Sequence, residues 1–396
     1  MNNLFADRMA KTHKSFIREI LKVTVNPEVI SFAGGLPNPN TFPVQQVIEA
    51  SKKVLTEDGE DVLQYSTTEG YLPLRQYIAQ RYLKRKGLNI RPDEILITNG
   101  SQQALDLIGK VFLNKGDHIV IERPGYLGTL QAFAIFEPQF EPVPLLEDGI
   151  DIDLFKKAVD SNEIKLFHAV INFQNPSGVT YSKEKRPALA DICRNRNMIL
   201  VEDDPYGELR FIGQDLPSMR SYLEDNIILL GSFSKIVAPG LRLGWICAKK
   251  RVMEKIVIAK QAADLHSNYL SQRIVYQYLA DNDIDQHILK IREIYKRQRD
   301  QMVSMIEKTF PGEAKSTRPE GGMFLWVTLP ENLSSMDLFE LAQKENVAFV
   351  PGQAFYVDGG GNNTLRLNFS NSDEEKIEKG IKRLAKVIKE LLAKKK

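Results

Sequence analysis

The sequence predicts an α/β protein, with a large domain built on a mainly parallel sheet flanked by helices and a smaller α+β domain. Three observations lead to this prediction. From about residue 93 to residue 230, short apolar strand patterns alternate with helical patterns, which is typical of a parallel sheet with helices on both faces. Beyond Val252, long amphipathic helices predominate and only two segments have strand character. The length of 396 residues is sufficient for two domains.

The N-terminal part of the chain contains helices and loops rather than strands. Apolar residues at helical spacing predict helices over 11–25, 44–55 and 72–85. Segment 31–39, SFAGGLPNP, is rich in Gly and Pro. Such a loop allows its backbone to approach a ligand closely.

The predicted strands of the large domain are short and apolar, and polar turns follow them. These strands cover 94–98, 118–122, 166–171, 198–202 and 227–230. The predicted helices include 101–113, with a hydroxyl residue as its N-cap, and 187–196. Because ligands of such sheets bind at the carboxyl ends of the strands, the turns after the strands form the candidate binding site.

The C-terminal part predicts the smaller domain. Its expected elements are helices over 252–280 and 284–309, strands over 323–327 and 364–369, and a last helix over 373–392. We expect residues 1–55 to pack with the small domain, 56–270 to form the large cofactor-binding domain, and 271–396 to form the small domain.

The composition fits a cytoplasmic globular protein. Apolar residues make up 43% of the chain, charged residues make up 26%, and the net charge is +2, so the overall charge indicates neither nucleic acid nor a membrane as a partner. Cys193 and Cys247 cannot form a disulfide framework. The histidines lack metal-ligand spacing, and no apolar run approaches the length of a membrane span.

The stretch 231–245, GSFSKIVAPGLRLGW, is the main candidate for chemistry. It follows the apolar run 227–230, and it contains Lys235 and, seven residues later, Arg242. A lysine that leaves a buried strand is partly desolvated, which favours its neutral amine. Only the neutral amine forms a Schiff base with a carbonyl group. A surface loop that happens to carry these two cations is the alternative interpretation.

Other strand ends supply groups suited to an anion. A helix that begins at Ser101 presents free backbone N–H groups and the positive end of its dipole. Gln102 adds a donor, and Arg242 with Ser232 and Ser234 completes a possible phosphate site. Helix capping alone also explains Ser101.

The remaining turns carry groups suited to an aromatic ring. Tyr126 follows a Pro-Gly turn and is suited to stacking, although an ordinary loop tyrosine is an equal alternative. Asn175 opens an NPSG turn that also explains it structurally. Asp203 ends a buried strand, where an unpaired carboxylate is costly, and it is suited to hold a protonated pyridine nitrogen. Asp204 is the alternative for that role, and Tyr206 is suited to reach a phenolic oxygen.

These motifs together resemble those of the fold-type-I enzymes that use pyridoxal 5′-phosphate, in the class I/II aminotransferase branch. The resemblance covers nearly the whole chain and implies the aspartate-aminotransferase-like fold. Within the family, the sequence most resembles the 2-aminoadipate aminotransferases of lysine biosynthesis and the related aromatic aminotransferases. The matching motifs are GGLP at 34–37, QYSTTEG at 64–70, TNGSQQA at 98–104, QNPSG at 174–178, EDDPY at 202–206, GSFSK at 231–235 and TLRL at 364–367.

The resemblance implies roles for the residues that hold the cofactor. Lys235 would form the Schiff base and then act as the general base, Asp203 would pair with the pyridinium nitrogen, Asn175 and Tyr206 would hold the phenolate oxygen, and Tyr126 would stack on the ring. The phosphate would be bound by Ser101, Gln102, Ser232, Ser234 and Arg242.

The resemblance also implies a homodimer with shared sites. Tyr65 would reach the phosphate of the neighbouring subunit. Arg366 would bind the α-carboxylate of the substrate, which suits a bidentate guanidinium, with help from Asn175 and the backbone at Gly35. In segment 15–22, Ser15 and Arg18 match positions that meet a distal carboxylate in aminoadipate enzymes.

The implied activity is a ping-pong transamination between an L-amino acid and a 2-oxo acid such as 2-oxoglutarate. We expect broad specificity over 2-aminoadipate, glutamate, and aromatic or branched apolar amino acids. A C–S or β-lyase on the same scaffold is the first alternative, because the fold does not separate these reactions. A ligand-sensing regulator is the second alternative, but only about ten residues precede the first predicted helix, which is too few for a DNA-binding domain.

Overall fold

A computed structural model describes residues 4–10 and 26–395 of the chain. Its main body is a central sheet of eight strands in the order β2-β9-β8-β7-β6-β3-β4-β5. β9 runs antiparallel to β2 and β8, and β5 runs antiparallel to β4, whereas the other neighbours are parallel. The strands are β2 (Ile95–Thr98), β3 (His118–Arg123), β4 (Gln139–Leu146), β5 (Gly149–Ile150), β6 (Ile164–Ala169), β7 (Ile199–Asp203), β8 (Ile227–Ser232) and β9 (Gly244–Cys247).

Helices cover both faces of this sheet because successive residues of a buried strand point to opposite sides. In β2, Leu96 joins one core with α5, α6 and α9, whereas Ile95 and Ile97 join the other core, which includes residues of α4, α7 and α8. The helices are α4 (Leu72–Lys86), α5 (Ser101–Phe112), α6 (Leu127–Ala134), α7 (Ile152–Ser161), α8 (Lys185–Asn195) and α9 (Lys250–Asp264).

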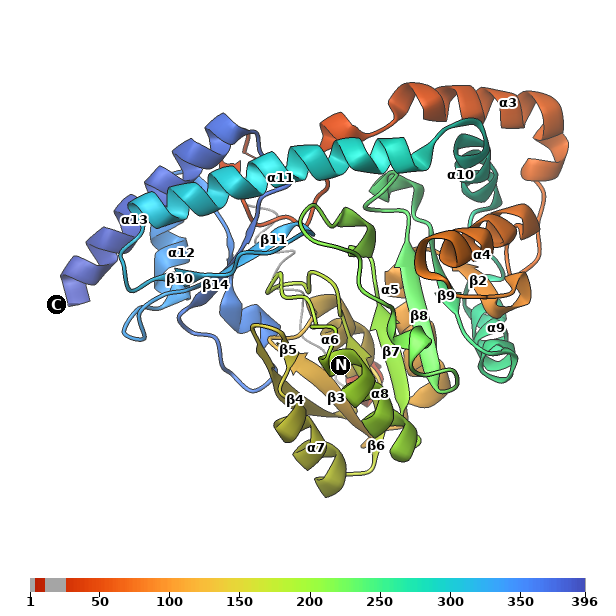
Figure 1. The fold of residues 1–396 in the computed structure, drawn as a ribbon, viewed down its shortest axis with the longest axis horizontal. Coiled ribbons are helices and arrows are strands. Elements are labelled where there is room, and N and C mark those ends of the chain that lie inside the picture. The colour runs from red at the N-terminus through yellow and green to blue at the C-terminus, as the bar shows by residue number, and fades with distance from the viewer. Residues whose placement is uncertain (1–3, 11–25, 396) are drawn as a thin grey trace.

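A second, smaller sheet lies beside the first (Figure 1). It is antiparallel, with the order β10-β11-β14-β13, and a separate parallel pair joins β1 to β12. The strands are β1 (Ile30–Ser31), β10 (Lys315–Ser316), β11 (Phe324–Thr328), β12 (Val347–Ala348), β13 (Val350–Pro351) and β14 (Thr364–Asn368).

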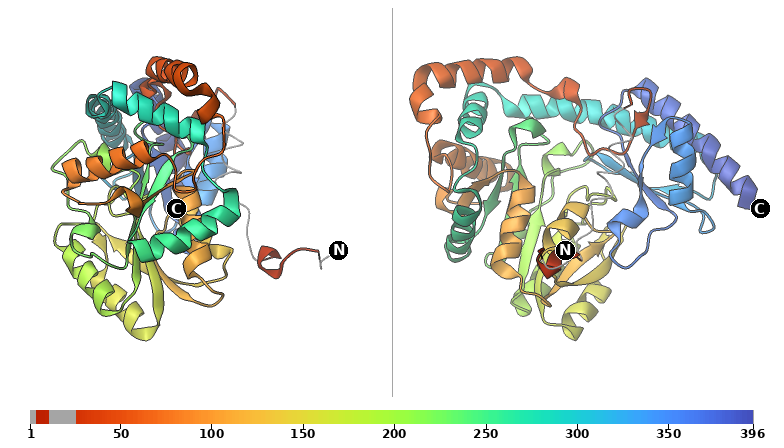
Figure 2. Two further views of the ribbon diagram at one scale, coloured as in Figure 1. Left: turned by 90° about the vertical axis from the view of Figure 1, so that its right-hand side faces the viewer. Right: turned by 180° about the vertical axis from the view of Figure 1, so that it is seen from behind.

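Long helices connect the two sheets. In Figure 1, α11 runs across the top of the molecule and packs along α13, while α10 packs on α3 and α4. Figure 2 shows the same arrangement from the side and from behind. The remaining helices are α1 (Asp7–Ala10), α3 (Val44–Val62), α10 (Tyr269–Asp281), α11 (Ile284–Thr309), α12 (Ser335–Lys344) and α13 (Glu374–Lys395), and short 3-10 helices cover Pro39–Thr41, Pro92–Glu94, Gly207–Leu209, Met219–Ser221, Pro239–Leu241 and Gly352–Phe355.

The structure agrees with the predicted α/β class and corrects several elements. The single helix predicted over 252–280 is two helices, because Leu265 adopts φ +62° and ψ −61° between them. The predicted hydroxyl N-cap of α5 is wrong: Ser101 is its first helical residue, and Gly100 caps it with φ +75°. α3 continues to Val62, beyond the predicted end at residue 55. The sequence patterns gave no indication of β4, β5, α7 or β9.

Two expectations are left as predictions. The helix over 11–25 lies outside the described residues, and the domain boundaries at 55 and 270 remain untested. None of the helices within the described ranges has both the length and the apolar character needed to cross a bilayer.

Candidate active site

A cavity of about 390 Å³ opens at the carboxyl ends of the central strands. Most of the residues that line it come at or just after the ends of β2, β3, β6, β7 and β8 in the sequence. Gly35 and Arg366 close the cavity from the side of the small sheet. This size is typical of pockets for small ligands. The lining consists of Gly35, Gly100, Ser101, Gln102, Tyr126, Leu127, Gly128, Gln131, Asn175, Pro205, Tyr206, Ser232, Ser234, Lys235, Arg242 and Arg366.

Lys235 supplies the only side-chain amine among these lining residues. Its Nζ donates a hydrogen bond to the carbonyl oxygen of Gly35 at 3.0 Å. Burial, together with the cations Arg242 and Arg366, lowers the pKa of Lys235 from its ordinary 10.5 to about 8. About a tenth of the amine is therefore neutral, and thus nucleophilic, at pH 7, and this fraction rises with pH.

Asp203 is the last residue of β7; it does not line the cavity itself, but its charge acts on Tyr126 and Tyr206, which do. Its side chain is only 1% exposed, and in the described structure neither carboxylate oxygen accepts a hydrogen bond. The nearest cation-forming group is His168, whose Nε2 lies 3.6 Å from Oδ2. A buried carboxylate without donors is costly, so this position favours a ligand with a positively charged N–H group.

The two acidic neighbours of Asp203 already have donors. Glu202 accepts hydrogen bonds from the Ser218 hydroxyl at 2.7 Å and from the Met219 backbone at 2.9 Å. Asp204 accepts one from the amide of Asn172 at 3.0 Å. Of the three acids in this run, Asp203 is therefore the one whose carboxylate is left for a ligand.

Arg366 on β14 forms the opposite wall. Its Nη1 donates to Asn175 Oδ1 at 2.8 Å and its Nη2 donates to the Ala33 carbonyl oxygen at 2.6 Å, whereas its buried Nε has no partner among the described residues. The guanidinium also lies over the Phe324 ring, 4.4 Å from the centroid. Burial lowers the pKa of Arg366 to about 10, so it stays cationic at neutral pH. Both of its hydrogen-bond acceptors are uncharged, which leaves a buried positive charge that suits a carboxylate.

The N-terminus of α5 and Arg242 form the end of the cavity suited to an anion. Gly100 adopts φ +75° and ψ 171°, and a Cβ atom there would lie 2.8 Å from Arg242 Nη2. Arg242 donates to the Asn99 carbonyl oxygen at 3.3 Å. Because the first N–H groups of a helix lack partners within the helix, they and the guanidinium point to phosphate binding.

Two tyrosines flank the cavity between these ends. Burial raises the pKa of Tyr126 to about 12 and also raises the pKa of Tyr206. Both phenols therefore keep their protons at neutral pH. The Tyr206 hydroxyl accepts a long hydrogen bond from the amide of Asn175 at 3.5 Å.

The cavity lining contains most of the predicted residues, but neither Asp203 nor Tyr65 is part of it. Tyr65 does not line the cavity of its own chain: its side chain is 79% exposed, and its ring meets that of His266 at 5.8 Å. Ser15 and Arg18 lie outside the described residues. The sequence reasoning missed His168, because its approach to Asp203 depends on the pairing of β6 with β7.

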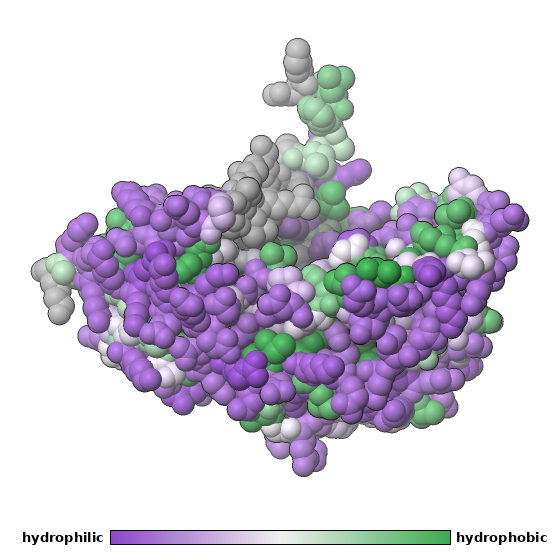
Figure 3. Space-filling view, turned by 90° about the horizontal axis from the view of Figure 1, so that it is seen from above, coloured by the Kyte–Doolittle hydropathy of each residue, from purple (hydrophilic) through white to green (hydrophobic). Residues whose placement is uncertain are grey.

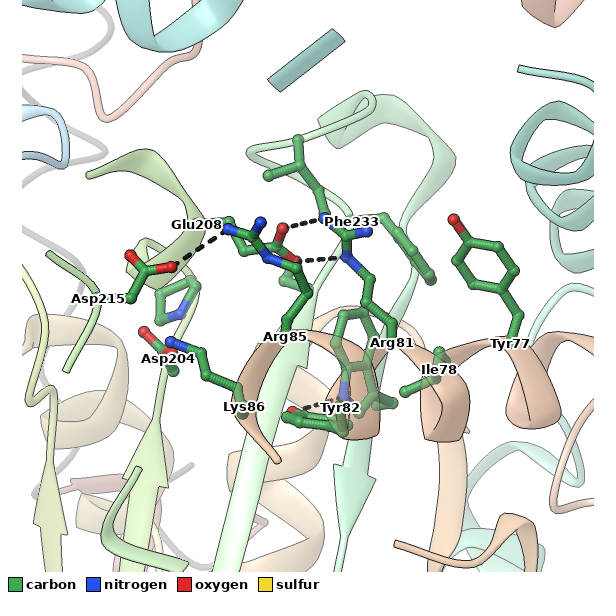
Figure 4. Close-up of a pocket in the computed structure, with 14 residues that line it drawn as sticks. Tyr77, Ile78, Arg81, Tyr82, Arg85, Lys86, Asp204, Glu208, Asp215 and Phe233 are labelled. Carbon is green, nitrogen blue, oxygen red and sulfur yellow. Dashed lines mark hydrogen bonds and ion pairs between the residues drawn. The ribbon is translucent and has the colours of Figure 1, made fainter. Parts of the chain in front are cut away.

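A second and much smaller cavity, of about 50 Å³, lies next to the first and shares Pro205 and Ser232 with it. Figure 4 shows the ion pairs around it, in which Arg81 binds Glu208 and Arg85 binds Asp215. Asp204 lines this cavity and not the larger one. The volume suits one or two water molecules rather than a substrate.

Comparisons with known proteins agree with this geometry. The family model "Aminotransferase class I and II" matches residues 27–384. Aromatic-amino-acid aminotransferase 1 of Thermococcus litoralis is 44% identical, over 98% of this chain and 95% of its own. The solved structure of the multiple substrate aminotransferase of Thermococcus profundus is 41% identical with a TM-score of 0.95, over 99% of both chains. The α-aminoadipate aminotransferase of Thermus thermophilus, solved in complex with N-(5′-phosphopyridoxyl)-L-leucine, is 40% identical with a TM-score of 0.92, over 99% of both chains.

Proposed function

We propose that this chain, which belongs to the class I and II aminotransferases and is thus an enzyme that transfers amino groups, uses pyridoxal 5′-phosphate as its cofactor. The cofactor would lie in the cavity of about 390 Å³ that contains Lys235. The family, together with a relative that binds a phosphopyridoxyl compound, implies this cofactor. When bound, the cofactor supplies an aldehyde carbon that takes up the amino group and a pyridinium ring that withdraws electrons. The observation that carries the proposal is the meeting of an amine, a guanidinium and an anion-binding helix end in one cavity.

The residues present fit this cofactor. The unpartnered carboxylate of Asp203 suits the N–H group of a pyridinium ring. The N-terminus of α5, with Arg242 and the buried Ser232 and Ser234, suits the phosphate. Tyr126 suits the face of the ring. Each part of the cofactor therefore has a protein group of matching chemistry.

In the proposed reaction, Lys235 and Arg366 do most of the work on the substrate. Arg366 binds the α-carboxylate and, with Asn175, fixes the orientation of the α-carbon. The neutral amine of Lys235 takes the proton from that carbon and returns it to the carbon that accepts the amino group. Asp203 keeps the ring nitrogen protonated, and Tyr206 donates from its phenol to the ring oxygen.

We propose a broad range of amino acids as substrates, including aromatic amino acids and 2-aminoadipate, with 2-oxoglutarate as a common acceptor. The names of the relatives support this range, because they refer to aromatic amino acids, multiple substrates and α-aminoadipate. The cationic side chains of the described lining are Lys235, Arg242 and Arg366, and each already has a role. A distal carboxylate would therefore need another cation, for which Arg18 is the candidate that the sequence offers.

We also propose a homodimer that shares its sites. The exposed ring of Tyr65 supports this proposal, as do the exposed apolar side chains of Val44, Ile48 and Leu55 on α3. The surface seen from above in Figure 3 is mostly hydrophilic, with separate apolar patches. Light scattering measures the oligomeric state, and a monomer that binds the cofactor fully would contradict the shared site. A cytoplasmic location is part of the proposal and rests on the composition.

Single-turnover spectroscopy tests the proposed function. The holoprotein is mixed with one amino acid and no oxo acid, and the absorbance of the bound cofactor is recorded while the 2-oxo acid is assayed. We expect stoichiometric 2-oxo acid and a cofactor in its amine form, with donors ranked by rate. Lys235→Ala is expected to lose both signals. Release of pyruvate and ammonia instead would favour the lyase, and no cofactor absorbance in the wild type would refute the proposal.

A further inference from the structure

An ion pair between a buried lysine and a partly exposed aspartate lies behind the turn that precedes α5. Lys260 on α9 is fully buried, and its Nζ donates to both carboxylate oxygens of Asp264, at 2.7 and 2.9 Å. Lys260 also donates to Gln103 Oε1 and to the Ser267 hydroxyl, both at 3.1 Å. The ammonium group therefore has all three of its protons engaged.

Asp264 and Gln103 hold the turn itself. Asp264 Oδ2 accepts hydrogen bonds from the amide of Asn99 at 2.8 Å and from the amide of Gln103 at 2.6 Å. Gln103 Oε1 accepts a further bond from the Asn99 backbone N–H at 2.8 Å. Asn99 is thus fixed through both its side chain and its backbone.

Asn99 connects this cluster to the groups suited to an anion. It precedes Gly100 and Ser101, whose N–H groups open α5, and its carbonyl oxygen accepts the hydrogen bond from Arg242. Asn99, Gln103, Lys260 and Asp264 do not line the cavity themselves. They can act on a ligand only through the position of the turn and of Arg242.

The chemistry of the cluster indicates a role beyond packing. Taking the Lys260 ammonium out of water is expensive, and an apolar side chain of similar volume would stabilise the contact between α9 and α5 at least as well. The ion pair contributes directed hydrogen bonds instead, and those bonds end on the turn. Burial lowers the pKa of Lys260, whereas Asp264 counteracts that effect.

We propose that Asp264, held by the buried Lys260, is a positioning residue that fixes the Asn99–Ser101 turn and Arg242 for the phosphate of the cofactor. The inference rests on the proposed function, because it assumes that this end of the cavity binds phosphate. Asp264 does not touch the ligand. Its contribution is to set the direction of the N–H groups at the start of α5.

Binding measurements on the apoprotein test the inference without any turnover. The dissociation constants of pyridoxal 5′-phosphate and of pyridoxal, which lacks the phosphate, are measured by quenching of tryptophan fluorescence. The variants are Asp264→Asn and Gln103→Met. Gln103→Met keeps the Lys260–Asp264 pair and the direct bond from Asn99 to Asp264, and removes the bonds of Gln103 to Asp264, to Lys260 and to the Asn99 backbone. It therefore remains informative if Asp264→Asn fails to fold. Asp106→Asn is the matched control, because Asp106 forms an exposed pair with Lys110 on the same helix, α5.

We expect both variants to bind pyridoxal 5′-phosphate roughly tenfold or more weakly, in the range typical of residues that orient a binding group, and to bind pyridoxal unchanged. The control is expected to match the wild type for both ligands. Equal loss for both ligands would indicate general destabilisation and overturn the inference, as would unchanged binding of both. A wild type that binds pyridoxal as tightly as its phosphate would instead refute the phosphate site of the proposed function.

Discussion

Replacing Asp203 by asparagine is expected to affect the apoprotein and the holoprotein in opposite directions. In the apoprotein, the substitution removes a carboxylate that is 1% exposed and lacks any hydrogen-bond donor in the described structure. The thermal stability of the apoprotein should therefore rise. In the holoprotein, the same change removes the proposed partner of the pyridinium nitrogen, so the affinity for the cofactor should fall.

The two magnitudes follow from hydrogen-bond energetics. Because asparagine is itself a buried polar group, the apoprotein gains only the extra cost of burying a charge in place of a neutral amide, on the order of 1–3 kcal/mol. With an unfolding entropy of about 2.1 cal/mol/K per residue, such a gain over 396 residues raises the Tm of the apoprotein by about 1–4 °C. A hydrogen bond to a charged group contributes about 1.5–3 kcal/mol, so the cofactor should bind about 10- to 150-fold more weakly.

Thermal unfolding with and without pyridoxal 5′-phosphate measures both effects. The expected result is a higher Tm for Asp203→Asn without the cofactor and a smaller rise in Tm when the cofactor is added. The alternative is that the Asp203 carboxylate already has a partner in the apoprotein. The imidazole of His168 lies 3.6 Å away and, when protonated, would stabilise that carboxylate. A lower Tm of the Asp203→Asn apoprotein would show such a partner and refute the reasoning.

Three further predictions concern the other parts of the site. Arg366→Lys is expected to lower kcat/KM for amino acids by roughly tenfold or more, because an ammonium cannot replace a guanidinium that binds two partners and a carboxylate. Steady-state kinetics check this value, and an unchanged kcat/KM would contradict the proposed carboxylate site. The rate at which the apoprotein reacts with pyridoxal 5′-phosphate should rise with pH through about 8, where Lys235 loses its proton, and then level off. Stopped-flow absorbance measures this rate. A rate that keeps rising towards about pH 10, the ordinary range of lysine, would contradict the lowered pKa of Lys235. Gly100→Ala should weaken cofactor binding, because alanine is strained at φ +75° and ψ 171° and its Cβ atom would meet Arg242. Gly87→Ala is the control for backbone strain alone in the same binding assay, because Gly87 has a positive φ but no atom lies within 4 Å of the added Cβ.

Most of the residues that the sequence placed at strand ends line one cavity, because each follows an apolar strand and the carboxyl ends of parallel strands meet at one edge; their roles stay predictions. It did not predict features that depend on longer-range packing. β4 carries Pro142 and Pro144, and proline within an apolar run argues against a strand. The spacing of Lys260 and Asp264 is typical of an exposed pair on a helix, and spacing alone does not indicate that the lysine is buried under the turn before α5.

The run Glu202-Asp203-Asp204 shows why three adjacent acids require a structure to tell them apart. Successive side chains of a strand point to opposite faces, so only one of the first two can point towards the ligand side of β7. Glu202 is held by Ser218 and Met219, and Asp204, just beyond the strand, lines the smaller cavity. We therefore expect Asp204→Asn to leave the dissociation constant of pyridoxal 5′-phosphate unchanged, whereas Asp203→Asn raises it. If fluorescence titrations gave the reverse order, the carboxylate assigned to the pyridinium nitrogen would be Asp204, and the unpartnered state of Asp203 would need another explanation.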